Sequence, residues 1–261
     1  MKKAIILRKV APMVIRKTPA EIASMRKAGL VLAGLLKELA DFIRPGITTG
    51  DIDRFAEDYI RARGAVPSFK GLYGFPASAC ISVNDEVVHG IPGSRRLREG
   101  DIVSVDVGAM VDGFHGDSAV TFPVGKVSAD AVRLLRVTEE SLYKGIEQAL
   151  PGKRIVDISR AIQEHVESHG FSVVRALAGH GIGRSVHEEP RVPNFVVRGD
   201  PGPELRPGAT LAIEPMVNAG SFDVVTLDDN WTVVTRDGSL SAHFEHTVAV
   251  TSDGPEILTA L

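Results

Sequence analysis

Two segments of the chain, residues 45–64 and 151–170, align with each other without a gap. They are identical at six positions: Pro45/Pro151, Gly46/Gly152, Asp51/Asp157, Ile52/Ile158, Arg54/Arg160 and Gly64/Gly170. Proline and glycine recur at helix boundaries in unrelated chains, so the order of elements is the stronger observation. In each copy a long helical pattern precedes the Pro-Gly pair, and a second helical pattern and then strands follow it. We therefore predict two related α+β halves, joined near residues 123–128.

Helix boundaries follow from capping and stop signals. A capping box runs from Thr18 to Glu21, with Pro19 at the first helical position. The Pro-Gly pairs and the glycines that follow each repeat mark helix ends. These signals predict helices over residues 22–43, 50–63, 128–150 and 155–169. The remainder of the chain is expected to be mostly strand and loop.

A hairpin is predicted around the Asp112-Gly113 pair, which is a strong signal for a two-residue turn. The flanking segments are typical of strands, since valine is frequent in them: residues 102–108 and 117–122. Without a bulge, Asp106 lies opposite Ala119 and is therefore a diagonal neighbour of Asp117 on the same face. Such diagonal pairs have Cα atoms about 7–8 Å apart.

Five residues at or near strand-like segments have side chains that bind metals: Asp106, Asp117, His180, Glu214 and Glu245. Four carboxylates in one pocket repel one another unless cations neutralise them. Oxygen ligands with one imidazole and no thiolate suit a hard to borderline divalent ion. Two such ions would balance four negative charges, at a separation of roughly 3.5–4 Å. Because the five residues come from both halves, the site is predicted between the halves.

Simpler interpretations exist for single residues. An isolated aspartate in a strand is usually a solvated acid, and a lone histidine is usually a satisfied surface or core residue. His165 and His169 lie four residues apart on one predicted helix, a spacing that can chelate a metal. No other ligand motif accompanies them, so we interpret them as part of a polar helix face. His115 and His246 are likewise interpreted as ordinary surface or core residues.

Composition excludes several classes of protein. The chain has 261 residues and a net charge of −3, which allows a sizeable core and gives no reason to expect DNA or an anionic membrane as partner. Its single cysteine, Cys80, excludes a disulfide framework. The N-terminal apolar run is too short for a signal peptide, and no stretch approaches a membrane span. We expect a soluble, cytoplasmic monomer.

Six motifs together resemble the methionine aminopeptidases. They are Val105-Asp106-Val107-Gly108, Gly116-Asp117, Gly179-His180-Gly181-Ile182-Gly183, His187-Glu188-Glu189-Pro190, Ile213-Glu214-Pro215 and Phe244-Glu245-His246-Thr247. The type I form is the more similar, since the chain lacks the helical insertion between the last two motifs. The resemblance implies a pita-bread fold, with pseudo-twofold α+β halves and a curved antiparallel sheet covered by helices. It also implies an N-terminal extension over residues 1–18 and one catalytic domain over 19–261, with halves of about 19–125 and 126–261.

The resemblance assigns roles to these residues. Asp106 resembles the bidentate ligand of one metal, and Asp117 and Glu245 resemble the bridging ligands. His180 and Glu214 resemble the remaining ligands of the second metal. A metal-bridged hydroxide would attack the scissile carbonyl, and Glu214 would act as general base and then acid.

Two further histidines match catalytic positions of the family. His89 resembles the histidine near the scissile amide. His187 resembles the one that binds the substrate carbonyl and stabilises the tetrahedral intermediate.

A methionine-binding pocket is implied by position. Selecting methionine needs an apolar pocket with aromatic contacts to sulfur, and its expected walls are Phe69, Phe75, Cys80 and Trp231. Taken alone, Trp231 is better explained as ordinary core packing. The chain departs from the common family residues at five positions. Tyrosine is more usual at Leu72 and at Phe75, a Gly-Phe pair is more usual at Ser185 and Val186, and glutamine is more usual at His243. His243 is hypothesised to tune the metal ligands, so His243→Gln should shift metal affinity or the pH profile.

The implied reaction is removal of the initiator methionine from nascent proteins, preferably before a small second residue. The two ions could be Co, Mn, Fe, Ni or Zn, and the family suggests a monovalent cation near Asn84 and Ser241. Ribosome contact is expected from the function. The alternatives are an Xaa-Pro aminopeptidase or prolidase of the same fold, a non-catalytic binding protein, and a metal-free amidinohydrolase. The last two should have lost ligands that this chain retains.

Overall fold

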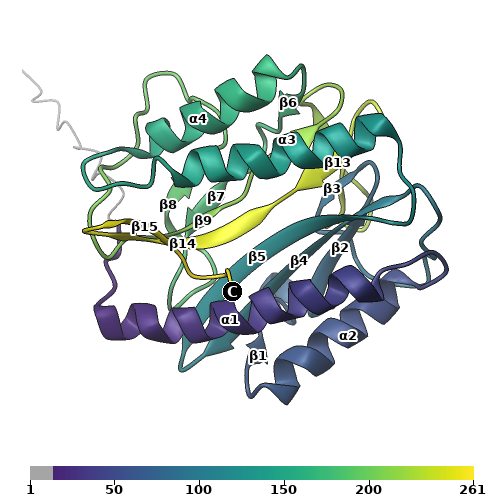
Figure 1. Ribbon diagram of the computed structural model, residues 1–261, viewed down its shortest axis with the longest axis horizontal. Coiled ribbons are helices and arrows are strands. Elements are labelled where there is room, and N and C mark those ends of the chain that lie inside the picture. The colour runs from purple at the N-terminus through teal and green to yellow at the C-terminus, as the bar shows by residue number, and fades with distance from the viewer. Residues whose placement is uncertain (1–13) are drawn as a thin grey trace, which may run out of the picture.

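The protein is described here from a computed structural model, which covers residues 14–261. Residues 1–13 of the expected N-terminal extension lie outside the described residues. The described residues form four α-helices. Figure 1 shows them arranged in pairs, α1 with α2 and α3 with α4, against a curved sheet. No helix within residues 14–261 combines the length and apolar character that crossing a membrane requires.

The four helices lie close to their predicted positions. They are α1 (Pro19–Phe42), α2 (Thr49–Ala62), α3 (Ala129–Ile146) and α4 (Ile155–Ser168). The predicted capping box of α1 is present, because Thr18 and Glu21 exchange side-chain and backbone hydrogen bonds. Helix α3 ends at Ile146, earlier than predicted. Its chain tightens into i→i−3 hydrogen bonds there, as from Ala149 N–H to the Ile146 carbonyl.

The main sheet has nine strands in the order β1-β4-β5-β14-β9-β7-β8, with β2 on β4 and β15 on β14. Two three-stranded sheets, β13-β10-β6 and β11-β12-β3, complete the fold. The first-half strands are β1 (Val66–Pro67), β2 (Ala79–Val83), β3 (Glu86–Val88), β4 (Ile102–Val111) and β5 (Phe114–Pro123). The next strands are β6 (Ser172–Val173), β7 (Gly179–Gly181), β8 (Glu188–Val192), β9 (Thr210–Ile213) and β10 (Met216–Asn218). The last are β11 (Val224–Thr226), β12 (Val233–Thr235), β13 (Ser241–His243), β14 (Glu245–Thr251) and β15 (Gly254–Ile257), and a short 3₁₀ turn, η1 (Leu72–Gly74), follows β1.

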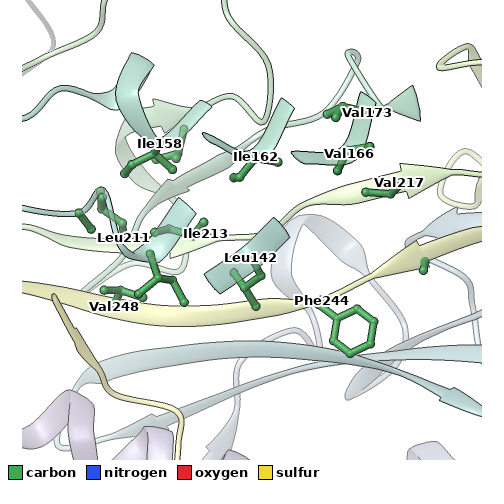
Figure 2. Close-up of a cluster of buried hydrophobic side chains, with 14 of the residues drawn as sticks. Leu142, Ile158, Ile162, Val166, Val173, Leu211, Ile213, Val217, Phe244 and Val248 are labelled. Carbon is green, nitrogen blue, oxygen red and sulfur yellow. The ribbon is translucent and has the colours of Figure 1, made fainter. Parts of the chain in front are cut away.

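Alternation along the strands divides the sheet into a helix-covered face and a site face. Val103, Val105 and Val107 of β4 pack in one core with α1 and α2. Leu211 and Ile213 of β9 pack in the other core with α3 and α4. Figure 2 shows this second cluster, in which Leu142, Ile158 and Ile162 of the helices meet the sheet residues. Since strand side chains alternate, Asp106 and Glu214 point to the face away from the helices.

The structure explains the predicted repeat in detail. Helices α2 and α4 are the same length, and in both the N-cap backbone N–H donates to the Asp side chain at N3, Asp51 or Asp157. Each of these aspartates also pairs with an arginine three residues on, Arg54 or Arg160. The identical residues therefore form the same helix-start arrangement twice.

The predicted hairpin is confirmed residue by residue. Asp106 pairs with Ala119 and Gly108 pairs with Asp117, as expected from a two-residue turn. Asp112 and Gly113 have φ values of +52° and +77°, as a type I′ turn requires. Both strands are longer than predicted, because the ladder continues to the turn at Val111 and Phe114.

Candidate metal centre

The five predicted ligands converge on the site face of the sheet. Asp106 and Asp117 come from neighbouring strands β4 and β5, and Glu245 begins β14, where it pairs with Ala119 of β5. His180 lies on β7 opposite Ala212 of β9, and Glu214 follows the end of β9. All five line one pocket, which has a cavity volume of about 290 Å³.

Their side-chain atoms lie within coordinating range of one another. The His180 Nε2 atom is 3.4 Å from Glu214 Oε1 and 4.0 Å from Asp117 Oδ2. One ligand atom each of Asp117, His180 and Glu245 lie within 4.8 Å of one another. These three side chains are therefore close enough together to hold a divalent ion.

The carboxylates have too few protein partners for their degree of burial. Asp106 Oδ1, Asp117 Oδ1 and Glu245 Oε1 are buried without a hydrogen bond in the described residues. Burial raises the pKa of Asp106 to about 7 and raises the pKa of Asp117, Glu214 and Glu245 well above the usual carboxyl range, with further contributions from neighbouring acids for these last three. Divalent cations would supply the missing partners and stabilise the ionised forms. The residues therefore fit a metal centre.

The backbone around His180 prepares one nitrogen for a metal. Its Nδ1 atom donates to the Gly181 carbonyl at 2.9 Å, which leaves the Nε2 lone pair free to coordinate. Burial lowers the pKa of His180 to about 4, so the ring is neutral near pH 7. A Cβ on Gly179 would lie 2.4 Å from the Ala212 carbonyl oxygen, and one on Gly181 would lie 2.2 Å from that of Glu189. The two glycines therefore permit the close strand approach that places His180.

The two expected catalytic histidines line the same pocket. His187 lies at the exposed rim, with its ring centroid 4.5 Å from that of His180. His89 lies deeper, edge-on to Trp231 at 6.5 Å, and has a φ of +59°. Burial lowers the pKa of both rings. Each histidine thus borders both the carboxylates and the aromatic wall.

All four predicted wall residues meet in one apolar cluster. Phe69, Phe75 and Cys80 pack there with Trp231, and the Phe75 and Trp231 rings are 5.1 Å apart in an edge-on arrangement. The cluster contains three of the positions that depart from the family pattern: Leu72, Phe75 and Val186. Burial and the neighbouring carboxylates raise the pKa of the Cys80 thiol well above its usual value. Its thiol is therefore an apolar wall group here.

The sequence analysis missed Tyr73. Its ring stacks on His187, with centroids 5.8 Å apart and an interplanar angle of 17°. Tyr73 is 75% exposed and has a φ of +49°, so no apolar periodicity marks it. The available signal was its place between Gly71 and Gly74, both of which have positive φ.

A second antiparallel strand pair, β9 with β14, repeats the arrangement of the β4–β5 hairpin. Ser104 pairs with Thr121 in β4–β5, and Ala212 pairs with Thr247 in β9–β14. When the pair Ser104–Thr121 is aligned with the pair Ala212–Thr247, Asp106 occupies the position equivalent to Glu214. In the same alignment Asp117 occupies the position equivalent to His243. The sequence analysis did not detect this relationship, because the two segments share few identical residues.

His243 is buried next to the ligands. Its Nε2 atom lies 3.9 Å from Glu214 Oε2 and has no hydrogen-bond partner in the described residues. Burial lowers the pKa of His243 to about 3, so the ring is neutral. An unpartnered neutral imidazole therefore points toward the metal centre from the second half.

A buried ion pair fixes the strand that follows His187. Lys17 Nζ lies 2.5 Å from Glu188 Oε2, and these side chains are 3% and 7% exposed. A Cβ on Gly183 would lie 2.2 Å from Lys17 Cε, so glycine leaves room for the lysine. The pair ties the segment before α1 to the β7–β8 loop.

Asn84 and Ser241, the expected monovalent-cation residues, lie side by side. Ser241 N–H donates to the Asn84 carbonyl at 2.8 Å, and Asn84 Oδ1 accepts from Ile102 N–H at 3.0 Å. The monovalent cation stays a prediction.

Residues 23–252 match the sequence profile of metallopeptidase family M24. The methionine aminopeptidase of Clostridium perfringens is 59% identical over 249 residues, which cover 95% of this chain and 100% of that one. Methionine aminopeptidase 1 of Bacillus subtilis is 57% identical over 249 residues, which cover 95% of this chain and 99% of that one. The solved methionine aminopeptidase of Thermotoga maritima is 48% identical with a TM-score of 0.93, over 95% of this chain and 100% of that one.

More distant structures share the architecture. A solved Xaa-Pro dipeptidase from Bacillus anthracis is 22% identical with a TM-score of 0.77, and the match covers 94% of this chain and 61% of that one. At that identity the similarity concerns the fold alone.

Proposed function

This chain belongs to metallopeptidase family M24 and is a methionine aminopeptidase, and from that premise we propose how its pocket works. The N-terminal methionine of a peptide enters past His187, and its side chain fills the apolar cluster around Phe75 and Trp231. This places the scissile amide over the carboxylates. The observation that carries the proposal is one pocket in which an apolar wall meets a group of buried carboxylates and histidines.

The metal ligands proposed are Asp106, Asp117, His180, Glu214 and Glu245. Their support is the set of unpartnered buried oxygens and the short distances from His180 Nε2. Divalent ions bound there would acidify a water molecule and polarise the scissile carbonyl. Two ions match the four negative charges, and their identity among Co, Mn, Fe, Ni and Zn depends on availability as well as ligands.

Proton transfer is assigned to Glu214. Its carboxylate lies at the junction between the ligands and His243. Glu214 would accept a proton at a carboxylate oxygen and pass it to the leaving amine. His187 and His89 would donate hydrogen bonds from neutral rings to the scissile carbonyl and amide region.

His243 is assigned a positioning role. We infer that its Nε2–H donates to Glu214 after closing a gap of 3.9 Å. This would fix the carboxylate in the orientation that coordinates and transfers protons. Its equivalence to Asp117 supports the assignment, since both positions face the same centre from opposite halves.

The cellular role is proposed from the same premise. The chain would act on nascent proteins in the cytoplasm as a monomer, in contact with the ribosome, and would prefer a small second residue. The remaining proposal for the chain's organisation is one catalytic domain over residues 19–261, divided near 125 and 126. An Xaa-Pro peptidase is not favoured, because the similarity to those enzymes concerns the fold alone.

The decisive experiment is hydrolysis of Met-Ala-Ser after metal removal and re-addition of one metal at a time. Activity should vanish on chelation and return with at least one of the five ions. Glu214→Ala and Asp106→Ala should abolish turnover in a folded protein. Substantial turnover by Glu214→Ala would refute its proton-transfer role, and hydrolysis of Xaa-Pro peptides without Met-Ala-Ser would reverse the choice of substrate.

A further inference from the structure

A second group of metal-binding side chains lies on the outer surface of α3 and α4, away from the pocket. His165 and His169 belong to α4 and its C-terminal cap, and Glu140 comes from α3. One ligand atom of each lies within 4.8 Å of the other two. The two histidines were interpreted from sequence as a polar helix face, and the fold supplies the missing third ligand.

The geometry points to a binding site for one borderline divalent ion, such as Zn²⁺, held by Glu140, His165 and His169. Imidazole nitrogens with one carboxylate suit zinc, nickel and copper better than magnesium or calcium. Three protein ligands leave a fourth position for water. The site would clip α3 to α4 at the surface of the second half.

The His169 ring is already oriented for this role. His169 Nδ1 donates to the His165 carbonyl at 2.7 Å, which leaves Nε2 as the free nitrogen. That backbone bond is the support that metal-binding histidines commonly have. The two rings lie 4.6 Å apart between centroids.

The carboxylate is also in place. His165 Nε2 lies 3.1 Å from Glu140 Oε2, which is close to the edge of about 3.4 Å expected between ligands in a tetrahedral zinc site. The Arg136 Nε atom lies 3.9 Å from the other oxygen, Oε1. Oε2 is therefore available, and an ion would replace the proton that now links His165 and Glu140.

Close packing of the helices holds the ligands in this arrangement. A Cβ on Gly145 of α3 would lie 2.8 Å from Ile162 of α4, so the helices already approach closely beside the triad. Figure 1 shows α3 and α4 side by side along their lengths. Little chain entropy would be lost on binding an ion between two elements that are already fixed.

Zinc stoichiometry of the full chain tests the site. Equilibrium dialysis at low micromolar free zinc, followed by metal analysis, compares the natural chain with Glu140→Gln, His169→Gln and Glu164→Gln. Glu164 is an exposed acid on α4 outside the triad, so its variant is the matched control. The natural chain and the control should bind one more zinc per chain than either triad variant, since the catalytic pocket is the same in all four.

Thermal unfolding provides a second readout. Zinc should raise the melting temperature of Glu164→Gln more than that of Glu140→Gln, while all variants hydrolyse Met-Ala-Ser at the natural rate. Equal zinc content in all four proteins would overturn the proposal. Should His169→Gln not fold, Glu140→Gln, at a partly exposed position, decides by the same criterion.

Discussion

Asp117 and His243 occupy equivalent positions about the pseudo-twofold axis, and each is held by a threonine from the other half. The Thr247 hydroxyl accepts from Asp117 N–H at 2.9 Å and donates to the Asp117 carbonyl at 2.8 Å. The Thr121 hydroxyl makes the same two bonds with His243, both at 2.8 Å. The backbone of His243 is therefore held in the same way as the backbone of Asp117, and both positions face the candidate metal centre.

Replacing His243 should weaken metal binding. His243→Leu removes the donor next to Glu214, and a lost outer partner typically costs about 10- to 100-fold in metal affinity. His243→Gln keeps an N–H and should shift affinity less, in the same direction. Calorimetric titration of the metal-free protein with Co²⁺ measures both. His246→Leu is the control, because His246 lies on the next strand, β14, and contacts Tyr143 of α3. Unchanged affinity in His243→Leu would refute the positioning role.

Metal removal should lower thermal stability as well as activity. Chelation leaves the buried carboxylates of Asp117 and Glu245 without counterions. At a metal concentration of 100 times the dissociation constant, bound metal would add about 2.7 kcal/mol to stability. Scanning calorimetry with and without chelator measures the loss. Asp117→Asn should show a smaller difference, and an identical difference in both proteins would argue against Asp117 as a ligand.

Lys17→Met should destabilise the protein strongly. It leaves Glu188 buried without its partner, and breaking a buried ion pair costs about 3–5 kcal/mol. Urea unfolding of the metal-loaded chain measures the effect. The exposed Arg184–Glu21 pair is the comparison, because Arg184→Met should cost less than about 1 kcal/mol. Equal losses of unfolding free energy in Lys17→Met and Arg184→Met would contradict the prediction that the buried ion pair contributes more than the exposed one.

Glu57→Gln should change acid stability. Lys70, Arg61 and Ser78 lower the pKa of Glu57 from its ordinary 4.5 to about 2. Because the pKa is lower in the folded state, the ionised Glu57 carboxylate stabilises the fold fully above about pH 4.5. This stabilisation is lost as the pH falls toward 2. The variant should be less stable by about 1 kcal/mol at pH 7. Urea unfolding at several pH values should show that the difference in the free energy of unfolding between the natural chain and Glu57→Gln shrinks below pH 4.5. A difference that stays constant with pH would contradict the prediction.

The Trp231 ring should recognise the methionine sulfur. Sulfur–aromatic contacts contribute about 0.3–1.5 kcal/mol, so Trp231→Leu should raise KM for Met-Ala-Ser about 2- to 10-fold with little change in kcat. A norleucine-Ala-Ser peptide, which lacks the sulfur, should be affected less. Phe222→Leu, at an exposed phenylalanine outside the pocket, is the control. Equal effects on both peptides would mean that Trp231 contributes only to the shape of the pocket and not to a contact with sulfur.

The sequence predicted those features that depend on local rules. The Asp112-Gly113 turn and the period of two fixed the register that joins Asp106 to Asp117. The capping box at Thr18 fixed the start of α1. The pocket residues were implied by the resemblance, since nothing local brings Phe69 and Trp231 together.

The features missed by sequence analysis depend on contacts between distant segments. Glu140 meets His165 only because α3 packs on α4. Tyr73 reaches His187 from a turn that has no periodic pattern. The equivalence of Asp117 and His243 requires two antiparallel strand pairs to be compared by register, since the side chains at the two positions differ.

The central position of β14 also has a consequence for the order of folding. This strand is synthesised after every other described strand except β15, yet it lies between β5 and β9 in the main sheet. Pairings between segments so far apart in sequence form late, because the intervening chain must first lose entropy. The first half can begin to fold during synthesis, but Glu245 joins the other four proposed ligands only when β14 inserts. The enzyme should therefore become active in one late step, with no partly active precursor on the ribosome.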